Sequence, residues 1–233
     1  MAESSSTVRT VRAVIFDWGG VITGPIAATV AAWLDADGID PERYAAVMRP
    51  WVQLAYGGDG AESPIHALER GEVSDAEFER TLAAALTGPD GPPVAAPGLL
   101  RRMFAASAVS AEMLGLIADL RASGLVTGLL SNSWGVSDGY PRHLFGGLFD
   151  DVVISGEVGM RKPEERIFLL AATRLRMEPG ECVFVDDVAG NITAAAKLGF
   201  GTVHHSEPAL TRQALSGLIS VRADRAGWDG QHR

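Results

Sequence analysis

Short apolar runs alternate with amphipathic segments over the second half of the chain. Runs rich in β-branched and aromatic residues are typical of strands buried on both faces, whereas apolar residues every three or four positions are typical of helices. The expected strands are residues 12–16, 125–130, 152–154, 182–185 and 202–203. The expected helices of this half are residues 110–123, 163–175, 188–198 and 208–218. This alternation predicts an α/β fold with a doubly wound, Rossmann-like parallel sheet.

The segment between the first two expected strands has a helical pattern and no expected strand. Its helices begin near Ile26, Pro41, Pro64 and Asp75. Ser74 precedes Glu77 by three positions, which is capping-box spacing. A glycine-rich run at 56–60 and the four prolines of 88–98 predict breaks in this pattern.

We therefore predict three parts of the chain. Residues 1–24 and 99–223 should form the Rossmann-like core, and residues 25–98 should form an inserted all-helical cap over the edge of the sheet. Residues 224–233 show no apolar pattern and are expected to form a loose tail.

Composition narrows the class of protein. A net charge of -9 without a basic cluster disfavours binding to nucleic acid. Cys182 is the single cysteine, which excludes an internal disulfide and a cysteine-based metal site. No apolar run is long enough to span a bilayer, and residues 1–12 lack the apolar stretch of a secretory signal, so we expect a cytoplasmic protein without membrane contact.

Carboxylates follow two of the expected strands. Asp17 ends an apolar run at a glycine turn, and Asp186 and Asp187 end another. Parallel strands would bring these acids to one edge of the sheet, where such folds bind ligands. Three carboxylates would repel one another without a cation, and oxygen ligands suit Mg²⁺.

Other polar residues are expected at the same edge. Ser131 and Asn132 follow a strand, Lys162 precedes a helix, and Asn191 lies near the start of another. A carboxylate can act as a nucleophile, Ser and Asn can donate hydrogen bonds to an oxyanion, and Lys supplies positive charge.

These motifs, in this order, resemble those of the haloacid dehalogenase-like (HAD) hydrolase superfamily over nearly the whole chain. The matching segments are residues 16–21 (Phe-Asp-Trp-Gly-Gly-Val), 130–132 (Leu-Ser-Asn), 162–163 (Lys-Pro) and 186–187 (Asp-Asp). Residues 159–164, 186–191 and 70–74 are similar to the branch with sugar-phosphate phosphatases and the phosphatase domain of soluble epoxide hydrolases.

The resemblance implies a Mg²⁺-dependent phosphomonoester hydrolase of a small phosphorylated metabolite. Asp17 would be the nucleophile that becomes an aspartyl-phosphate. The metal would be held by Asp17, the backbone carbonyl of Gly19 and Asp187, with Asp186 in or just outside the coordination sphere.

The remaining roles also come from the resemblance. Ser131 and Asn132 would bind the phosphoryl group, and Lys162 would neutralise its charge and orient Asp17. Asn191 would brace the loop on the metal side, and Gly19 and Gly20 would line the substrate.

Gly19 departs from the pattern of the family. Phosphatases of this superfamily usually carry a second Asp at this position as general acid and base. General acid–base catalysis typically raises the rate by ~10²–10⁴-fold. Its loss therefore predicts weak phosphatase activity, with a preference for substrates that have good leaving groups. A water, a substrate hydroxyl or a cap residue such as His66 are the candidate replacements.

Two alternatives stay open at this point. A metal-independent 2-haloacid dehalogenase also uses an Asp nucleophile without the second Asp, but the acidic pair Asp186–Asp187 argues against it. A catalytically weak phospholigand-binding or regulatory protein would keep the metal site and lose turnover.

Overall fold

The structure is a computed structural model, and it describes residues 10–56, 63–88, 92–135 and 140–226. Five parallel strands form a single sheet in the described part of the chain, in the order β3-β2-β1-β4-β5. The strands are β1 (Ala13–Phe16), β2 (Val126–Ser131), β3 (Asp151–Ile154), β4 (Cys182–Asp186) and β5 (Gly201–His204). The predicted doubly wound parallel sheet is confirmed, with strand ends shifted by at most one residue.

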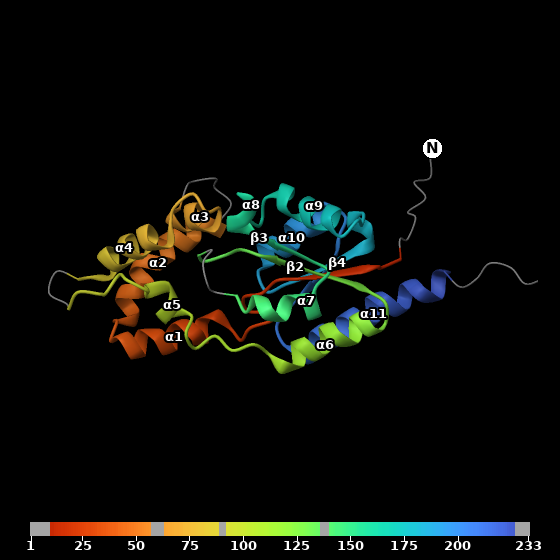
Figure 1. Ribbon diagram of the computed structural model, residues 1–233, viewed down its shortest axis with the longest axis horizontal. Helices are drawn as coiled ribbons and strands as arrows, with labels where there is room; N and C mark the ends of the chain where they lie inside the picture. Colours follow the sequence, from red (N-terminus) through yellow and green to blue (C-terminus); the bar gives the residue numbers. More distant parts are fainter. Residues whose placement is uncertain (1–9, 57–62, 89–91, 136–139, 227–233) are drawn as a thin grey trace, which may run out of the picture.

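Helices cover both faces of the sheet (Figure 1). The core helices are α6 (Ala111–Ala122), α7 (Phe145–Leu148), α8 (Ser155–Val158), α9 (Glu165–Arg174), α10 (Ala189–Lys197) and α11 (Pro208–Ala226). Two short 3₁₀ turns, Arg142–Leu144 and Pro179–Glu181, connect them. α6 and α11 pack on one face, and α9 and α10 pack on the other.

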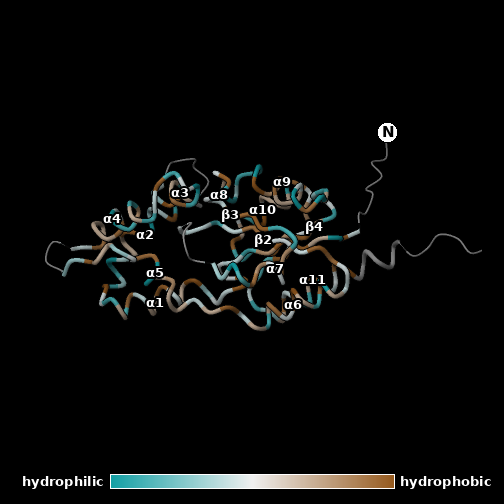
Figure 2. The backbone as a smooth tube through the Cα atoms, in the orientation of Figure 1, coloured by the Kyte–Doolittle hydropathy of each residue, from teal (hydrophilic) through white to brown (hydrophobic). Residues whose placement is uncertain are grey.

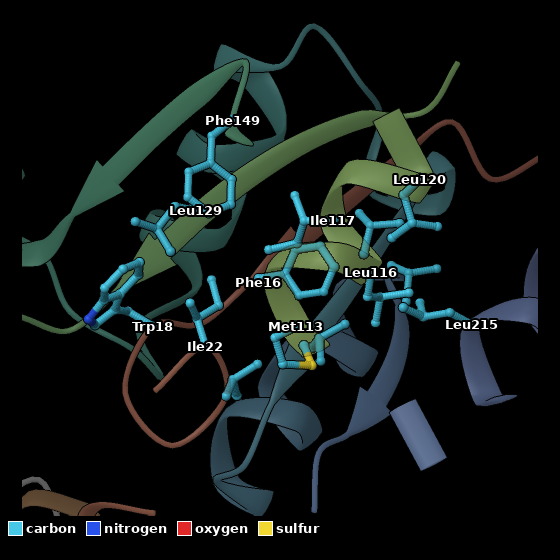
Figure 3. Packing of buried hydrophobic residues seen from close by; sticks show 14 of the residues in the cluster. Phe16, Trp18, Ile22, Met113, Leu116, Ile117, Leu120, Leu129, Phe149 and Leu215 are labelled. Carbon is cyan, nitrogen blue, oxygen red and sulfur yellow. The ribbon is translucent and has the colours of Figure 1, made fainter. Parts of the chain in front are cut away.

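Strand β1 shows why the apolar runs predicted buried strands. Val14 and Phe16 pack among residues of α6 and α11, whereas Ala13 and Ile15 pack toward α9. Figure 3 shows Phe16 surrounded by Leu116, Ile117 and other apolar side chains. All four residues of the strand are buried, as two covered faces require. In Figure 2, hydrophobic segments accordingly gather where the strands cross the core.

The helical insert lies beyond the carboxyl edge of the sheet, at the left of Figure 1. Its helices are α1 (Ile26–Asp37), α2 (Pro41–Tyr56), α3 (Pro64–Glu69), α4 (Asp75–Leu86) and α5 (Leu99–Met103). Ser74 caps α4, since its hydroxyl accepts a hydrogen bond from the Glu77 backbone N–H at 3.3 Å. An apolar cluster of their own holds these helices together, and it reaches Leu99 and Met103, past residue 98 where we placed the end of the cap. The domain division itself stays a prediction.

The C-terminal helix is longer than expected. α11 runs to Ala226, so residues 224–226 are helical where we predicted a loose tail. The rest of that tail, most of the N-terminal segment, the glycine-rich break after Tyr56 and part of the proline-rich linker lie outside the described residues. Among the described helices, none is long and apolar enough to cross a membrane.

Candidate active site

The ammonium of Lys162 lies between two buried carboxylates. Its Nζ is 2.8 Å from Asp17 Oδ1 and 2.7 Å from Asp186 Oδ2. Asp17 is 8% exposed, Lys162 is 1% exposed and Asp186 is fully buried. Ion pairs so well shielded from water are strongly held, because removing one partner leaves the other buried and unpaired.

The sheet itself places these groups side by side. Phe16 of β1 is in register with Val185 of β4, so the residues that follow, Asp17 and Asp186, are neighbours at the carboxyl edge. The Asp17 backbone N–H donates to the Val185 carbonyl at 2.9 Å, which continues the pairing one residue further. The chain departs from β1 to β2 on one side and reaches β4 on the other, so this is the topological switch point, where open α/β sheets bind ligands.

Negative charge is in excess at this edge. One ligand oxygen each from Asp17, Asp186 and Asp187 lies within 4.8 Å of the others. Burial raises the pKa of Asp17 to about 7 although Lys162 opposes the rise, and Asp186 and Asp187 add to it. Burial and then Asp186 also raise the pKa of Asp187.

Lys162 stays protonated in this environment. Burial alone would lower the pKa of its ammonium, but the charges of Asp17 and Asp186 outweigh burial and raise the pKa above its usual range. The site therefore carries a fixed positive charge beside its carboxylates at neutral pH.

Asp186 is saturated with hydrogen bonds from the protein. Besides Lys162, its carboxylate accepts from the Val188 backbone N–H at 2.7 Å and from Asn191 Nδ2, which is 3.1 Å from each oxygen. Asn191 projects from α10 and is buried. Asn191 thus holds the carboxylate of Asp186, and its role in bracing the loop on the metal side stays a prediction.

Two glycines follow Asp17, and they have different surroundings. Gly20 has a φ of +75°, and a Cβ there would lie 2.3 Å from Asp187 Oδ2. Only a residue without a side chain fits beside that carboxylate. A Cβ on Gly19 would lie 3.3 Å from the end of the Ile26 side chain and would meet no other residue as closely.

The loop after β2 brings two predicted residues to the same edge. Asn132 holds Lys162 by its backbone: Asn132 Oδ1 accepts from the Lys162 N–H at 2.8 Å, and its Nδ2 donates to the Lys162 carbonyl at 3.0 Å. Ser131 Oγ is 2.8 Å from the hydroxyl of Tyr140. The structure thus gathers all the predicted site residues on one edge, while their chemical roles stay predictions.

Three residues near the site were not predicted. Tyr140 contacts Ser131, and its ring packs edge-on against Trp18 at 5.8 Å. Glu69 and Arg161 form a buried ion pair at 2.5 Å, next to Asn132. Of these three residues, only Arg161 had a sequence signal, because it directly precedes Lys162.

His66, one of the candidates for the missing acid, is engaged inside the cap. It is 9% exposed, and its Nε2 is 3.0 Å from the Ala55 carbonyl. The structure therefore gives His66 a packing role between α2 and α3.

The chain is similar to known proteins over most of its length. A family model of haloacid dehalogenase-like hydrolases matches residues 11–199. The chain is 30% identical over 214 residues to mouse (Mus musculus) acyl-CoA dehydrogenase family member 10, in a match that covers 91% of this chain and 19% of the mouse protein. Rat (Rattus norvegicus) bifunctional epoxide hydrolase 2 is 24% identical, with 82% of this chain and 36% of the rat protein covered. The chain thus spans well under half of these two relatives.

A third relative is close to this chain in length. A sesquiterpene phosphatase of Aspergillus oryzae is 25% identical over 214 residues, covering 90% of this chain and 97% of the relative.

Solved structures share the fold. A HAD family enzyme from Bacteroides thetaiotaomicron, in complex with magnesium and inorganic phosphate, superposes with a TM-score of 0.56 at 20% identity and covers 84% of this chain and 94% of its own. A dehalogenase with an intermediate complex reaches 0.63 at 19% identity, covering 91% of this chain and 98% of its own.

Proposed function

Because this chain belongs to the haloacid dehalogenase-like hydrolase family, we propose that it is a Mg²⁺-dependent phosphatase of a small phosphorylated metabolite. The reaction would proceed through an aspartyl-phosphate on Asp17. The observation that carries the proposal is the cluster of Asp17, Asp186 and Asp187, in which the ammonium of Lys162 lies between the two buried carboxylates of Asp17 and Asp186.

The residues at this edge fit a magnesium ion. Carboxylate and carbonyl oxygens are its preferred ligands, and the three acids are close enough to share one ion. Gly20 leaves the space that the Asp187 carboxylate occupies. Asp17, the Gly19 carbonyl and Asp187 would hold the ion, with Asp186 behind them. When bound, Mg²⁺ would offset the excess negative charge and stabilise charge that develops on phosphoryl oxygens.

Asp17 is held in a fixed orientation for nucleophilic attack. Its Oδ1 accepts from Lys162 Nζ and from the Trp18 backbone N–H at 2.7 Å. In the first step a carboxylate oxygen of Asp17 forms a bond to phosphorus while the bond from phosphorus to the leaving oxygen breaks. Water then hydrolyses the acyl phosphate, which releases phosphate and restores the carboxylate.

The phosphoryl group would be bound next to Asp17 by Ser131, Asn132 and Lys162. Ser131 and Lys162 present a hydroxyl and an ammonium at this edge, and Asn132 would donate from its backbone N–H, because its side-chain NH₂ already donates to the Lys162 carbonyl and to Glu69. Donors fixed in advance stabilise charge on the transferring oxygens more effectively than water, because they need no reorganisation.

Gly19 shapes the range of substrates. It offers no group to protonate the leaving oxygen, and the apolar end of Ile26 lies next to it. Substrates whose leaving group departs without a proton, such as acyl and aryl phosphates, should therefore react faster than alkyl phosphates.

A second candidate function, 2-haloacid dehalogenase activity, has one observation in its favour. The missing acid at Gly19 is also a feature of the 2-haloacid dehalogenases that the sequence raised as an alternative. The acid cluster argues against that reading, because a metal-free reaction gives no reason to gather three carboxylates. Release of halide from 2-haloacids without added metal would favour it.

The test is a screen of acyl, aryl and alkyl phosphates with Mg²⁺ and with a chelator, comparing the wild type with Asp17→Asn. We expect hydrolysis only with Mg²⁺ and only in the wild type. Mg²⁺-dependent phosphate binding by the wild type without any hydrolysis would instead favour a regulatory, phospholigand-binding protein.

A further inference from the structure

The cap and the core meet at a buried charge next to the candidate site. Glu69 is the last residue of α3 in the cap, and it is fully buried. Its carboxylate pairs with Arg161 of the core, which is 3% exposed, and Oε2 lies 2.5 Å from Arg161 Nε. A buried carboxylate is retained only where it is paired, so this contact ties α3 firmly to the core.

The same carboxylate reaches the phosphoryl-binding loop. Asn132 Nδ2 is 3.3 Å from Glu69 Oε2 and also donates to the Lys162 carbonyl. Asn132 Oδ1 in turn accepts from the Lys162 N–H. Glu69 therefore contacts Asn132 directly, and Asn132 in turn holds the backbone of Lys162, the residue that supplies the ammonium of the site.

A second contact ties this loop to the cap. The ring of Trp134, two residues after Asn132, packs edge-on against Phe78 at 5.9 Å and against Phe104 at 6.0 Å. Trp134 thus lies against the apolar cluster of the cap, although it follows a core strand. The cap thus contacts the loop after β2 at two residues, Asn132 and Trp134.

The surrounding surfaces are closely fitted. A Cβ on Gly71, just after α3, would lie 2.6 Å from the Gly156 carbonyl of α8. Nearby, Arg70 pairs with Glu164 of the core at 2.7 Å. These contacts hold the end of α3 against the core, in the position in which Glu69 meets Asn132.

We propose that Glu69 is a positioning residue of the cap that orients the side-chain amide of Asn132 and, through it, the Lys162 backbone, so that docking of α3 completes the site. The role rests on the proposed phosphatase function. A carboxylate in this place fixes the Asn132 amide with its NH₂ toward Glu69 and its oxygen toward the Lys162 N–H. Without it, the amide can turn, and Lys162 loses part of its support.

The experiment compares Glu69→Gln and Glu69→Asp with Glu79→Gln. Glutamine has the shape of Glu69 without its charge, and aspartate has the charge but is too short to keep the contact. Glu79 is the matched control, since it is also a buried cap carboxylate, but it accepts from the Gly98 and Leu100 backbone N–H groups, inside the cap. A loss of stability alone should appear in all three variants.

Two readouts separate positioning from stability. For p-nitrophenyl phosphate with Mg²⁺, both Glu69 variants should raise KM and the inhibition constant of inorganic phosphate about tenfold, as loss of one hydrogen bond to a charged group predicts. Glu79→Gln should leave both constants within a factor of two to three of the wild type, roughly the scatter of surface-type effects. In NMR spectra, the Asn132 side-chain NH₂, assigned by its loss in Asn132→Asp, should exchange with solvent faster in the Glu69 variants only.

The outcomes distinguish this inference from the proposed function. If the wild type hydrolyses the phosphate and the Glu69 variants match Glu79→Gln in KM and phosphate inhibition, the positioning role is refuted and the phosphatase stands. If the wild type neither hydrolyses nor binds phosphate, the phosphatase is refuted. In that case, solvent exchange of the Asn132 side-chain NH₂ still tests whether Glu69 orients it. An exchange rate unchanged in the Glu69 variants would reject the inference.

Discussion

Gly20 and Asp187 are so close that a Cβ on the glycine would lie 2.3 Å from the carboxylate oxygen Oδ2. Gly20 also has a φ of +75°, which L side chains adopt at a cost of about 1–2 kcal/mol. The turn after β1 thus passes close to the acid cluster because it has no side chain there, and Asp187 keeps its carboxylate within 4.8 Å of Asp17.

Gly20→Ala should therefore displace Asp187 and weaken Mg²⁺ binding. We expect the affinity for Mg²⁺ to fall at least tenfold, measured by isothermal titration calorimetry. Gly24→Ala is the matched control, because a Cβ at Gly24 meets nothing within 4 Å and its φ is not positive. Equal Mg²⁺ affinities of the two variants would show that Asp187 takes no part in binding the metal.

Gly19→Asp should restore the missing general acid. The new Cβ would lie 3.3 Å from Ile26 Cδ1, the flexible end of a side chain that is 37% exposed and can shift. Turnover of alkyl phosphates should rise by about 10²-fold, the lower end of what acid–base catalysis supplies, and turnover of aryl phosphates should rise less. Gly19→Asn has nearly the same size without the acid, so an equal gain in that variant would contradict the explanation.

The local sequence pattern was sufficient to predict the core of the fold and the position of the acids at the edge of the sheet. The run from Cys182 to Val185 predicted a buried strand, and parallel pairing with β1 then places Asp186 beside Asp17 without further information. Lys162 was found because its sequence context matched a known motif, and the structure puts its ammonium between these two acids.

The contacts between cap and core could not be predicted in the same way. Arg161 and Glu69 are 92 residues apart, and Asn132 and Glu69 are 63 apart, so no periodicity links them. Their pairing depends on how α3 docks against the core, which is set by shape and packing over the whole interface. The end of α11 was missed for another reason: a helix can continue by adding one hydrogen bond per residue where the apolar pattern has stopped.

Asn191→Ala should destabilise the protein by removing one of the hydrogen-bond donors of Asp186. Asp186 is fully buried, and Asn191 Nδ2 contacts both its oxygens. Loss of that donor should lower the free energy of unfolding by about 1–3 kcal/mol, measured by urea denaturation. Thr193→Ala, an exposed change in the same helix, should stay within about 0.5 kcal/mol of the wild type. Similar losses in both variants would mean that Asn191 supports α10 rather than Asp186.

Stability without Mg²⁺ should depend on pH through Asp17. Because burial raises the pKa of this acid from 3.8 to about 7, the folded protein binds a proton between these values that the unfolded chain releases. The contribution of Asp17 to the free energy of unfolding should therefore fall as pH rises from about 4 to about 7. Urea denaturation in a chelator should show this fall in the wild type and a smaller one in Asp17→Asn. Identical pH dependence of the two proteins would place the titration elsewhere.

The central claim is that Asp17 accepts the phosphoryl group of the substrate. The most direct measurement is rapid acid quenching of the enzyme during turnover of a phosphate-labelled acyl or aryl phosphate with Mg²⁺, followed by mass spectrometry of the peptide that contains residue 17. We predict one phosphoryl group on Asp17 in the wild type, and none when Mg²⁺ is chelated or when the residue is Asn. Rapid hydrolysis by the wild type with the label on another residue, or full turnover by Asp17→Asn, would contradict the mechanism.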